Sequence, residues 1–542
     1  MKQKISDILN NAVCRLRKER ALSSSVSLDI AVESPNNPFW GDYSSNIAIK
    51  LAKEESKPPL EIARLLSEKI TSLDEREKLF KKVDVAPPGF VNFFLDHGVL
   101  QKELSRAINL GEKWGSSGWG RGKKVLIEFV SANPTGPLHV GHGRWAVIGD
   151  ALASILTSAG CSVEREFYVN DVGRQVELLK GSVLARSRGE EVPEGGYGGE
   201  YVKELANELK DKLKKKDLTR VLIEHVLKGQ RLVLSSLGIR FDRWYYESSL
   251  YKKKMVYSAI DRLKRENVTF EEGGALWFKS KELGDDKNRV LIREDGLPTY
   301  FASDIAYHMD KFKRRYDQLI NVWGTDHHGY VARLKAAIKV LGFDPERLKI
   351  IIGQLVSLSR AGQPVRMSKR TGEMITLEEV VSETGSDATR FFFLMQSPDT
   401  HLDFDLELAK KHSNDNPVYY VQYAHARISS ILSEAGKAGF DIRKCLKGAD
   451  LGLLREEPEL ELIKKIISYP DEVLEAAKTL LPHRLINYVR DLSALFHNYY
   501  HRFRVISGEG EVSKARLSLI FATRIVLKNV LKLLNISAPD SM

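Results

Sequence analysis

The segment at residues 128–150, EFVSANPTGPLHVGHGRWAVIGD, constrains the fold of this chain more than any other part of its sequence. An apolar stretch over 125–130 predicts a strand, a turn with proline and glycine follows, and a helix is expected from about Gly141. Strand, turn and helix in this order are typical of an α/β fold that binds a nucleotide at the end of a parallel strand. The segment therefore predicts a nucleotide site at the start of that helix.

Two histidines in this segment, His139 and His142, are three residues apart and should share one face of the first helical turn. A helix N-terminus offers free N–H groups and the positive end of the helix dipole, which together favour a phosphate. Neutral imidazoles there suit a triphosphate whose charge redistributes during a reaction. Gly141 and Gly143 lack a Cβ, so that a base or a ribose could lie against the backbone. A His-x-Gly-His string is common by chance, so this interpretation needs a second element elsewhere in the chain.

That second element is RMSKRTG at residues 366–372, a basic loop ahead of a helical stretch over 376–384. A solvated run of charge would explain the loop by itself. Together, however, the two elements resemble the paired HIGH and KMSKS signatures of class I aminoacyl-tRNA synthetases. The versions SANPTGPLHVGHGR and MSKRTG resemble those of the arginyl-tRNA synthetase family. Arg366 stands where that family has lysine, so its role is open.

The resemblance implies an ATP-binding set, and within it a catalytic group of two histidines and one lysine. Lys369 would neutralise charge on the departing pyrophosphate, with Mg²⁺ sharing that work. The family's GxDHHG segment, present here at 324–329, would line the ribose and the substrate pocket. The expected catalytic residues are His139, His142 and Lys369. The expected ATP-binding residues are His139, Gly141, His142, Gly324, Asp326, Met367, Ser368 and Lys369.

A pocket for arginine is expected from residues that suit a guanidinium. Tyr300 and Asp304 are four residues apart, so on a helix they would pair an aromatic ring with a carboxylate on one face. A carboxylate can accept both arms of the guanidinium fork. Helix capping or a surface pair would also explain these two residues, but the string resembles the family's amino-acid-binding motif. The full set that the resemblance implies is Asn133, Tyr300, Asp304, Glu247 and His327, with Glu128 a weaker match.

The composition agrees with this assignment without establishing it. The chain has 542 residues, enough for about three or four domains, and a net charge of +11. An RNA partner suits that charge, and so would a merely basic enzyme. The three cysteines, Cys14, Cys161 and Cys445, lie far apart, which argues against a disulfide framework and against zinc. No apolar run has the length of a signal peptide or a membrane span, so a cytoplasmic location is expected.

The predicted fold class is multidomain α/β, and the sequence suggests three units. Residues 1–97 should form a small α+β domain, which resembles the family's N-terminal tRNA-contacting domain and whose aromatics we interpret as core. Residues 118–405 should form a Rossmann-like catalytic domain with strands near 124–130, 164–169, 318–323 and 349–356 and an insertion over about 180–290. Residues 406–542 should form a helical bundle that resembles the family's anticodon-binding domain.

Aromatic residues interleaved with arginine in this bundle are candidates for stacking on unpaired bases. Core packing is an equally good explanation for each tyrosine taken singly. The candidate tRNA-binding residues are Tyr420, Tyr423, Arg427 and Tyr499.

Taken together, the resemblance implies a monomeric enzyme that uses ATP and L-arginine to form arginyl-adenylate. The arginyl group would then pass to the 3′ end of tRNA(Arg), releasing AMP and pyrophosphate. Three alternatives stay open at this point: another class I synthetase such as the cysteine enzyme, a small-molecule adenylyltransferase, and a non-catalytic tRNA-binding paralogue. The cysteine enzyme predicts zinc ligands, the adenylyltransferase has no need of the terminal domains, and a paralogue should have lost the histidines or Lys369.

Overall fold

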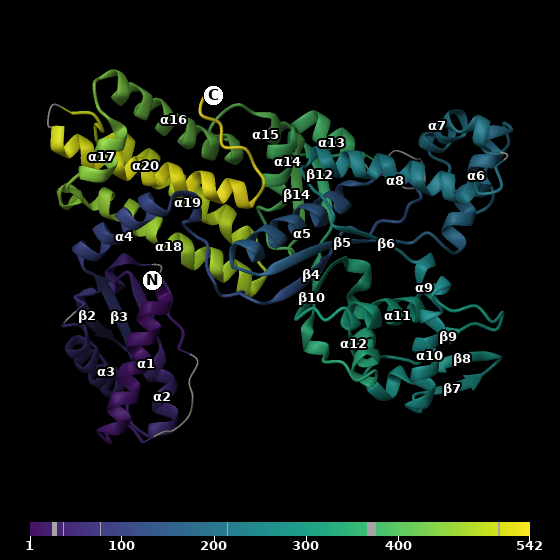
Figure 1. Ribbon diagram of the computed structural model, residues 1–542, viewed down its shortest axis with the longest axis horizontal. Helices are drawn as coiled ribbons and strands as arrows, with labels where there is room; N and C mark the ends of the chain where they lie inside the picture. The colour runs from purple at the N-terminus through teal and green to yellow at the C-terminus, as the bar shows by residue number, and fades with distance from the viewer. Residues whose placement is uncertain (24–29, 36, 76, 214, 366–374, 508–509) are drawn as a thin grey trace.

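A five-stranded parallel sheet forms the centre of the computed structural model, in the order β11-β10-β4-β5-β6 (Figure 1). The structure describes residues 1–23, 30–35, 37–75, 77–213, 215–365, 375–507 and 510–542. The strands are β4 (Lys124–Glu128), β5 (Ser162–Val169), β6 (Arg243–Tyr246), β10 (Gln318–Gly324) and β11 (Leu348–Gly353). The four apolar runs predict four of these strands, and the predicted α/β class with a parallel sheet is confirmed.

The short strand β6 corrects the predicted insertion over residues 180–290. It pairs with β5 between Glu166–Arg243 and Val169–Tyr246, so the chain returns to the sheet inside that range. Two excursions result, both on the right of Figure 1. The first holds α6 (Arg174–Ser187), α7 (Glu200–Glu208) and α8 (Leu218–Ser236); the second holds α9 (Ser248–Lys252), α10 (Met255–Arg265), β7 (Thr269–Glu272), β8 (Ala275–Phe278) and β9 (Arg289–Ile292). A strand of four residues is too short to produce a periodic signal.

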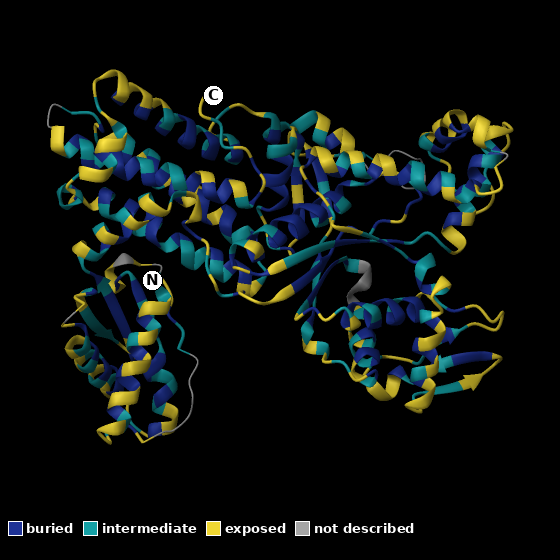
Figure 2. Cartoon of the chain, in the orientation of Figure 1, coloured by how far each residue is buried: buried dark blue, intermediate teal, exposed yellow. Residues whose placement is uncertain are grey.

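Helix α5 (Val140–Ser158) connects β4 to β5 and is buried along most of its length (Figure 2). Helices α11 (Tyr300–Lys313) and α12 (Val331–Val340) flank β10 in the sequence. A second layer near the start of α5 contains β12 (Val356–Arg360), β13 (Gln363–Pro364), α13 (Leu377–Thr384), α14 (Ser386–Phe393), β14 (Leu402–Asp405) and α15 (Leu406–Lys410). These elements position the two ends of the segment that contains the predicted lysine loop.

The N-terminal unit packs three helices on a small antiparallel sheet of order β1-β3-β2. These helices and strands agree with the predicted α+β class of this unit. The elements are α1 (Lys2–Lys18), β1 (Tyr43–Ser45), α2 (Ile47–Glu55), α3 (Pro59–Asp74), β2 (Phe80–Ala86) and β3 (Phe90–Leu95), followed by α4 (His97–Leu110). Phe93 belongs to the core, but Phe39 is 88% exposed and Trp40 57% exposed, so the interpretation of these two as core residues is wrong.

The C-terminal unit is helical, as predicted: α16 (Pro417–Lys437), α17 (Ile442–Gly448), α18 (Glu457–Thr479), α19 (His483–Arg502) and α20 (Gly510–Leu533). Helix α18 is continuous through Pro470. Proline normally ends a helix, but here Tyr469 and Val473 are both buried against neighbouring helices, and that packing holds the turn together. Among the residues that the structure describes, no helix is both long and apolar enough to cross a membrane.

A buried arginine joins the sheet layer to the C-terminal unit. Arg390 is fully buried and pairs with Asp150 of α5 at 2.7 Å. Its other guanidinium nitrogens donate to the backbone oxygens of Leu237 and Leu534, each at 2.8 Å. One side chain therefore ties α14 and α5 to the end of α8 and to the end of α20.

We expect Arg390→Lys to lower the free energy of unfolding by about 2 kcal/mol. A lysine keeps the charge opposite Asp150 but cannot reach both carbonyls, which are left buried and unpaired. Denaturant unfolding of the two proteins measures the difference. Arg360→Lys, in an exposed ion pair with Glu383, is the control and should change it by less than about 0.5 kcal/mol. Equal effects of the two substitutions would contradict this account of Arg390.

Candidate active site

The predicted site residues gather at the carboxyl ends of the parallel strands, where α/β folds place ligands. Asn133 lies in the loop after β4, Glu247 directly follows β6, and Gly324 is the last residue of β10. Tyr300 and Asp304 lie on the first turns of α11, whose N-cap is Thr299, so the prediction that both lie on one helix, four residues apart, is confirmed.

His139 and His142 form a self-capping pair at the start of α5. His139 is the N-cap residue, and its Nδ1 accepts the backbone N–H groups of Gly141 at 3.1 Å and His142 at 3.4 Å. In return, Nδ1 of His142 accepts the backbone N–H of His139 at 3.3 Å. The two rings stack with centroids 3.6 Å apart. The arrangement is a capping box in which imidazoles replace the usual serine and glutamate.

This capping decides which nitrogen of each ring is available for chemistry. A neutral imidazole has one N–H donor and one acceptor, and in both rings Nδ1 is the acceptor. The hydrogen of each neutral ring is therefore on Nε2. Both histidines can thus donate a hydrogen bond from Nε2 without giving up the helix cap.

The absence of a side chain serves a different purpose at each of the two glycines of the motif. A Cβ on Gly141 would lie 3.0 Å from Cε1 of His139, so this glycine leaves room for the imidazole. A Cβ on Gly143 would lie 2.3 Å from a methyl carbon of Leu377 on α13. Gly143 therefore allows α13 to pack on α5, and the space that we expected for a base or a ribose is filled by protein.

The chain just after the predicted lysine loop lies beside the first histidine. Residues 366–374, which include Met367, Ser368 and Lys369, lie outside the described part of the chain. The segment is preceded by β13, and directly after it Thr376 forms an antiparallel backbone bridge with His139. The N–H of Leu377 donates to the carbonyl of Leu138 at 2.8 Å. The C-terminal end of the segment is therefore fixed next to the first histidine.

Two carboxylates of the site have raised pKa values. Burial raises the pKa of Asp304 to about 7, although the hydroxyl of Tyr330 donates to its Oδ2. Burial also raises the pKa of Glu247 to about 7, and the charge of Asp304 adds to this, while hydroxyls of Ser303 and Tyr168 oppose it. Within the described ranges, neither carboxylate has a lysine or arginine ion-pair partner. A cation placed between them would therefore gain strongly from both.

A third carboxylate, Glu128, is already neutralised. The ammonium of Lys311, a fully buried side chain, pairs with Glu128 and donates to Oδ1 of Asn321 at 3.0 Å. This pairing makes Glu128 part of the framework under the site, so its weaker match as a substrate carboxylate is not supported. Sequence reasoning missed Lys311, since a lysine on an amphipathic helix normally faces solvent.

Less can be said of the remaining predicted residues of the catalytic unit. Tyr300 is 52% exposed. Asp326 and His327 belong to a 3₁₀ helix over Thr325–Tyr330 that directly follows β10, and their side chains lie outside what the structure describes. In the described ranges, no group of three or more His, Cys, Asp or Glu side chains is placed to bind a metal ion.

The candidate tRNA-binding residues divide into two groups. Tyr420, Tyr423 and Arg427 lie half-buried along α16, with the guanidinium of Arg427 5.2 Å from the centre of the Tyr423 ring. These three can still present faces to a partner. Tyr499 is fully buried and stacks on Phe503, so its assignment to base stacking is corrected to core packing.

Family models match three successive parts of the chain. The arginyl tRNA synthetase N terminal domain matches residues 1–95. The catalytic domain of class I (R) tRNA synthetases matches residues 104–193 and 189–399. The DALR anticodon binding domain matches residues 421–542. The catalytic model alone covers more than half of the chain.

Curated relatives match over the full length. An arginine–tRNA ligase of Caldanaerobacter subterraneus subsp. tengcongensis is 46% identical, with 100% of this chain and 99% of the relative covered. One from Geobacter sp. strain M21 is also 46% identical, with 95% of each covered. Among solved structures, the arginyl-tRNA synthetase of Thermus thermophilus has a TM-score of 0.78 at 24% identity, with 100% of both chains covered, and so shares the fold.

Proposed function

Because this chain belongs to the arginyl-tRNA synthetase family, we propose that it charges tRNA with arginine at the strand-end site. The single observation that supports this location of the catalytic site is the backbone bridge between Thr376 and His139. It joins the end of the lysine segment to the capped histidine pair, so that both can act on one nucleotide. The division into units 1–97, 118–405 and 406–542 is part of the proposal, as are a monomeric state and a cytoplasmic location.

L-Arginine is recognised through its guanidinium by Asp304 and Glu247. Their raised pKa values support this role, because a cation bound beside these buried carboxylates would stabilise their charged forms. Tyr300 would stack on the guanidinium, and Asn133 would orient the amino-acid end. His327 is kept as a further contact.

ATP is held at the N-terminus of α5 and reacts in line with the arginine carboxylate, which attacks the α-phosphorus while pyrophosphate leaves. His139 and His142 donate from Nε2 to phosphate oxygens, Gly141 leaves room for the His139 ring, and Lys369, with Met367 and Ser368, would neutralise charge on the leaving group. Gly324 and Asp326 are the residues proposed to bind the ribose. Mg²⁺ belongs to the proposal as the counter-ion of the triphosphate, and so as part of the substrate.

The second half of the reaction consumes the arginyl-adenylate. The 3′-terminal ribose hydroxyl of tRNA attacks the carbonyl carbon, AMP leaves, and the hydroxyl proton is lost. Tyr420, Tyr423 and Arg427 on α16 support a tRNA contact away from this centre, because their ring faces and a guanidinium suit base stacking.

We expect arginine affinity to fall as pH drops through about 7. In the free site Asp304 and Glu247 both have a pKa of about 7, and the guanidinium requires their charged forms. Arginine therefore binds with its full affinity above this pH, and its affinity declines below it. Since both protons must leave, the dissociation constant should be about 100-fold higher at about pH 6 than at about pH 8. Calorimetry in buffers of different ionisation enthalpy measures the proton release; a flat profile would contradict the raised pKa values.

Pyrophosphate exchange with each amino acid in turn, with and without tRNA, tests the proposed function. Arginine should drive the exchange, and the other amino acids should not. Exchange driven by cysteine would indicate another class I synthetase, exchange without any tRNA-bound product would indicate a small-molecule adenylyltransferase, and tRNA binding without exchange would indicate a non-catalytic paralogue. Each of these results would reject the proposal.

A further inference from the structure

Side chains of the first excursion from the sheet, which comprises helices α6, α7 and α8, donate hydrogen bonds to the loop between β4 and the first histidine. Gln230, on α8, donates from Nε2 to the backbone oxygens of Asn133 at 3.2 Å and Gly136 at 2.9 Å. Tyr201, on α7, donates its hydroxyl to the backbone oxygen of Thr135 at 2.9 Å. Three carbonyls in four consecutive residues thus accept hydrogen bonds from side chains of one excursion.

The contact between Tyr201 and the loop is close, and any side chain at Gly136 would crowd the tyrosine ring. A Cβ on Gly136 would lie 3.1 Å from Cζ and 3.2 Å from the hydroxyl oxygen of Tyr201. Gln230 is only 2% exposed, and its Nε2 makes both of its hydrogen bonds to this loop. The two side chains therefore meet the loop backbone directly.

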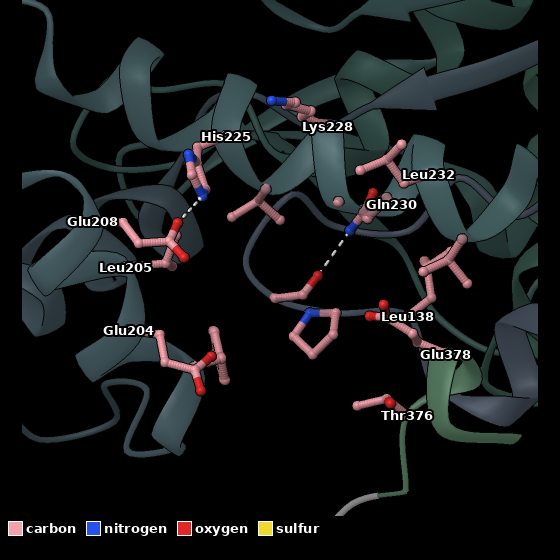
Figure 3. A pocket seen from close by; sticks show the side chains of 16 residues that line it. Leu138, Glu204, Leu205, Glu208, His225, Lys228, Gln230, Leu232, Thr376 and Glu378 are labelled. Carbon is pink, nitrogen blue, oxygen red and sulfur yellow. Dashed lines mark hydrogen bonds and ion pairs between the residues drawn. The ribbon is translucent and has the colours of Figure 1, made fainter. Parts of the chain in front are cut away.

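Beside these contacts the packing is incomplete. A cavity of about 350 Å³ opens between the loop, helices α7 and α8, and the start of α13, and Figure 3 shows the side chains around it. Gly136 and Leu138 line it from the loop, and Thr376 and Glu378 line it from the adjoining start of α13. Because side chains do not fill this space, hydrogen bonds fix the loop against α8 more than close packing does.

We propose that Gln230 and Tyr201 are positioning residues for catalysis, which set the place of the loop that leads into His139. The same loop carries Asn133, whose own carbonyl is one of the three that are held. A displacement of about 1 Å in a reacting group lowers a rate by about 100-fold. The inference rests on the proposed function. It gives the first excursion a role in positioning the catalytic loop, through residues that act on the loop and not on the substrate.

Gln230→Met tests the first of these residues at nearly constant volume. Oε1 of Gln230 is buried and has no hydrogen-bond partner among the described residues, so methionine removes an unpaired acceptor together with the donor. This makes folding of the variant expected. The turnover number in arginylation should fall about 10- to 100-fold, and Tyr201→Phe should lower it about 3- to 10-fold. The KM for tRNA should stay within about twofold of wild type.

Lys228→Met is the matched control. Lys228 lies on the same helix and lines the same cavity, but it is exposed and makes no hydrogen bond to the loop in the described part of the chain. Its turnover should match wild type. Equal losses in Lys228→Met and Gln230→Met would overturn the proposal, because general damage to α8 would then explain both.

A pH profile of Gln230→Glu separates positioning from mere stability. The charged carboxylate cannot donate to the two carbonyls and repels them, whereas the protonated acid donates to one. Activity relative to wild type should therefore recover as the pH falls from about 8.5 to about 6. A ratio that does not change with pH would overturn the proposal, as would wild-type turnover in Gln230→Met. If wild type itself does not arginylate tRNA, the proposed function fails first, so the two failures are distinguishable.

Discussion

Replacing Asp304 by asparagine is expected to weaken arginine binding by about 2–5 kcal/mol, or about 30- to 4,000-fold in the dissociation constant. Asparagine keeps the size of the side chain and can still accept the hydroxyl of Tyr330. It removes the charge, and its amide N–H₂ faces the donors of the guanidinium. Equilibrium binding of arginine, measured with tRNA present, gives the difference directly.

Asp310→Asn is the matched control for this substitution. Asp310 lies on the same helix and pairs with Arg314 at 3.4 Å, so its charge serves the framework and not the site. Its loss should leave the arginine dissociation constant within about twofold. An affinity of Asp304→Asn close to that of wild type would refute the assignment of this carboxylate to the guanidinium.

His139→Asn is expected to lower turnover by about 100- to 1,000-fold while leaving the unfolding temperature unchanged. The Oδ1 of asparagine occupies the place of the imidazole Nδ1, and asparagine is among the best N-cap residues, so the helix start is preserved. The substitution removes the proposed Nε2 donor to the phosphates. The expected loss of turnover is the size typical of removing one hydrogen-bond donor to a transition state. Single-turnover formation of the adenylate measures the effect.

His139→Ala provides the comparison, because it removes the cap and the donor together. It should match His139→Asn in turnover but lose about 1 kcal/mol of stability as well. If His139→Asn retained wild-type turnover, the histidine would serve only as a cap, and its proposed role in catalysis would be wrong.

The parts of the fold that sequence could predict are those with long periodic signals. The apolar strands at 124–130 and 318–323 and the amphipathic helices of the C-terminal unit repeat often enough to be recognised. Strand β6 has four residues and α17 has seven, too few to separate from loops. The continuous helix through Pro470 was unpredictable, because tertiary packing overrides a local helix breaker.

Within the site, residue types indicate what chemistry a side chain can perform, but they do not show which other side chains it contacts. The spacing of Tyr300 and Asp304 predicts their shared helix face, since helical geometry is local. The pairing of Glu128 with Lys311 joins residues far apart in the chain, and no local pattern shows which carboxylate is neutralised. The burial of Tyr499 depends on neighbouring helices for the same reason.

A crystal structure with arginine, tRNA and a non-hydrolysable ATP analogue tests the central claim most directly. The account predicts the guanidinium between Asp304 and Glu247, the triphosphate within hydrogen-bond distance of Nε2 of both His139 and His142, and the Lys369 ammonium on its outer phosphates. A triphosphate bound away from the start of α5, or a Lys369 that stays out of reach of the phosphates, would contradict it.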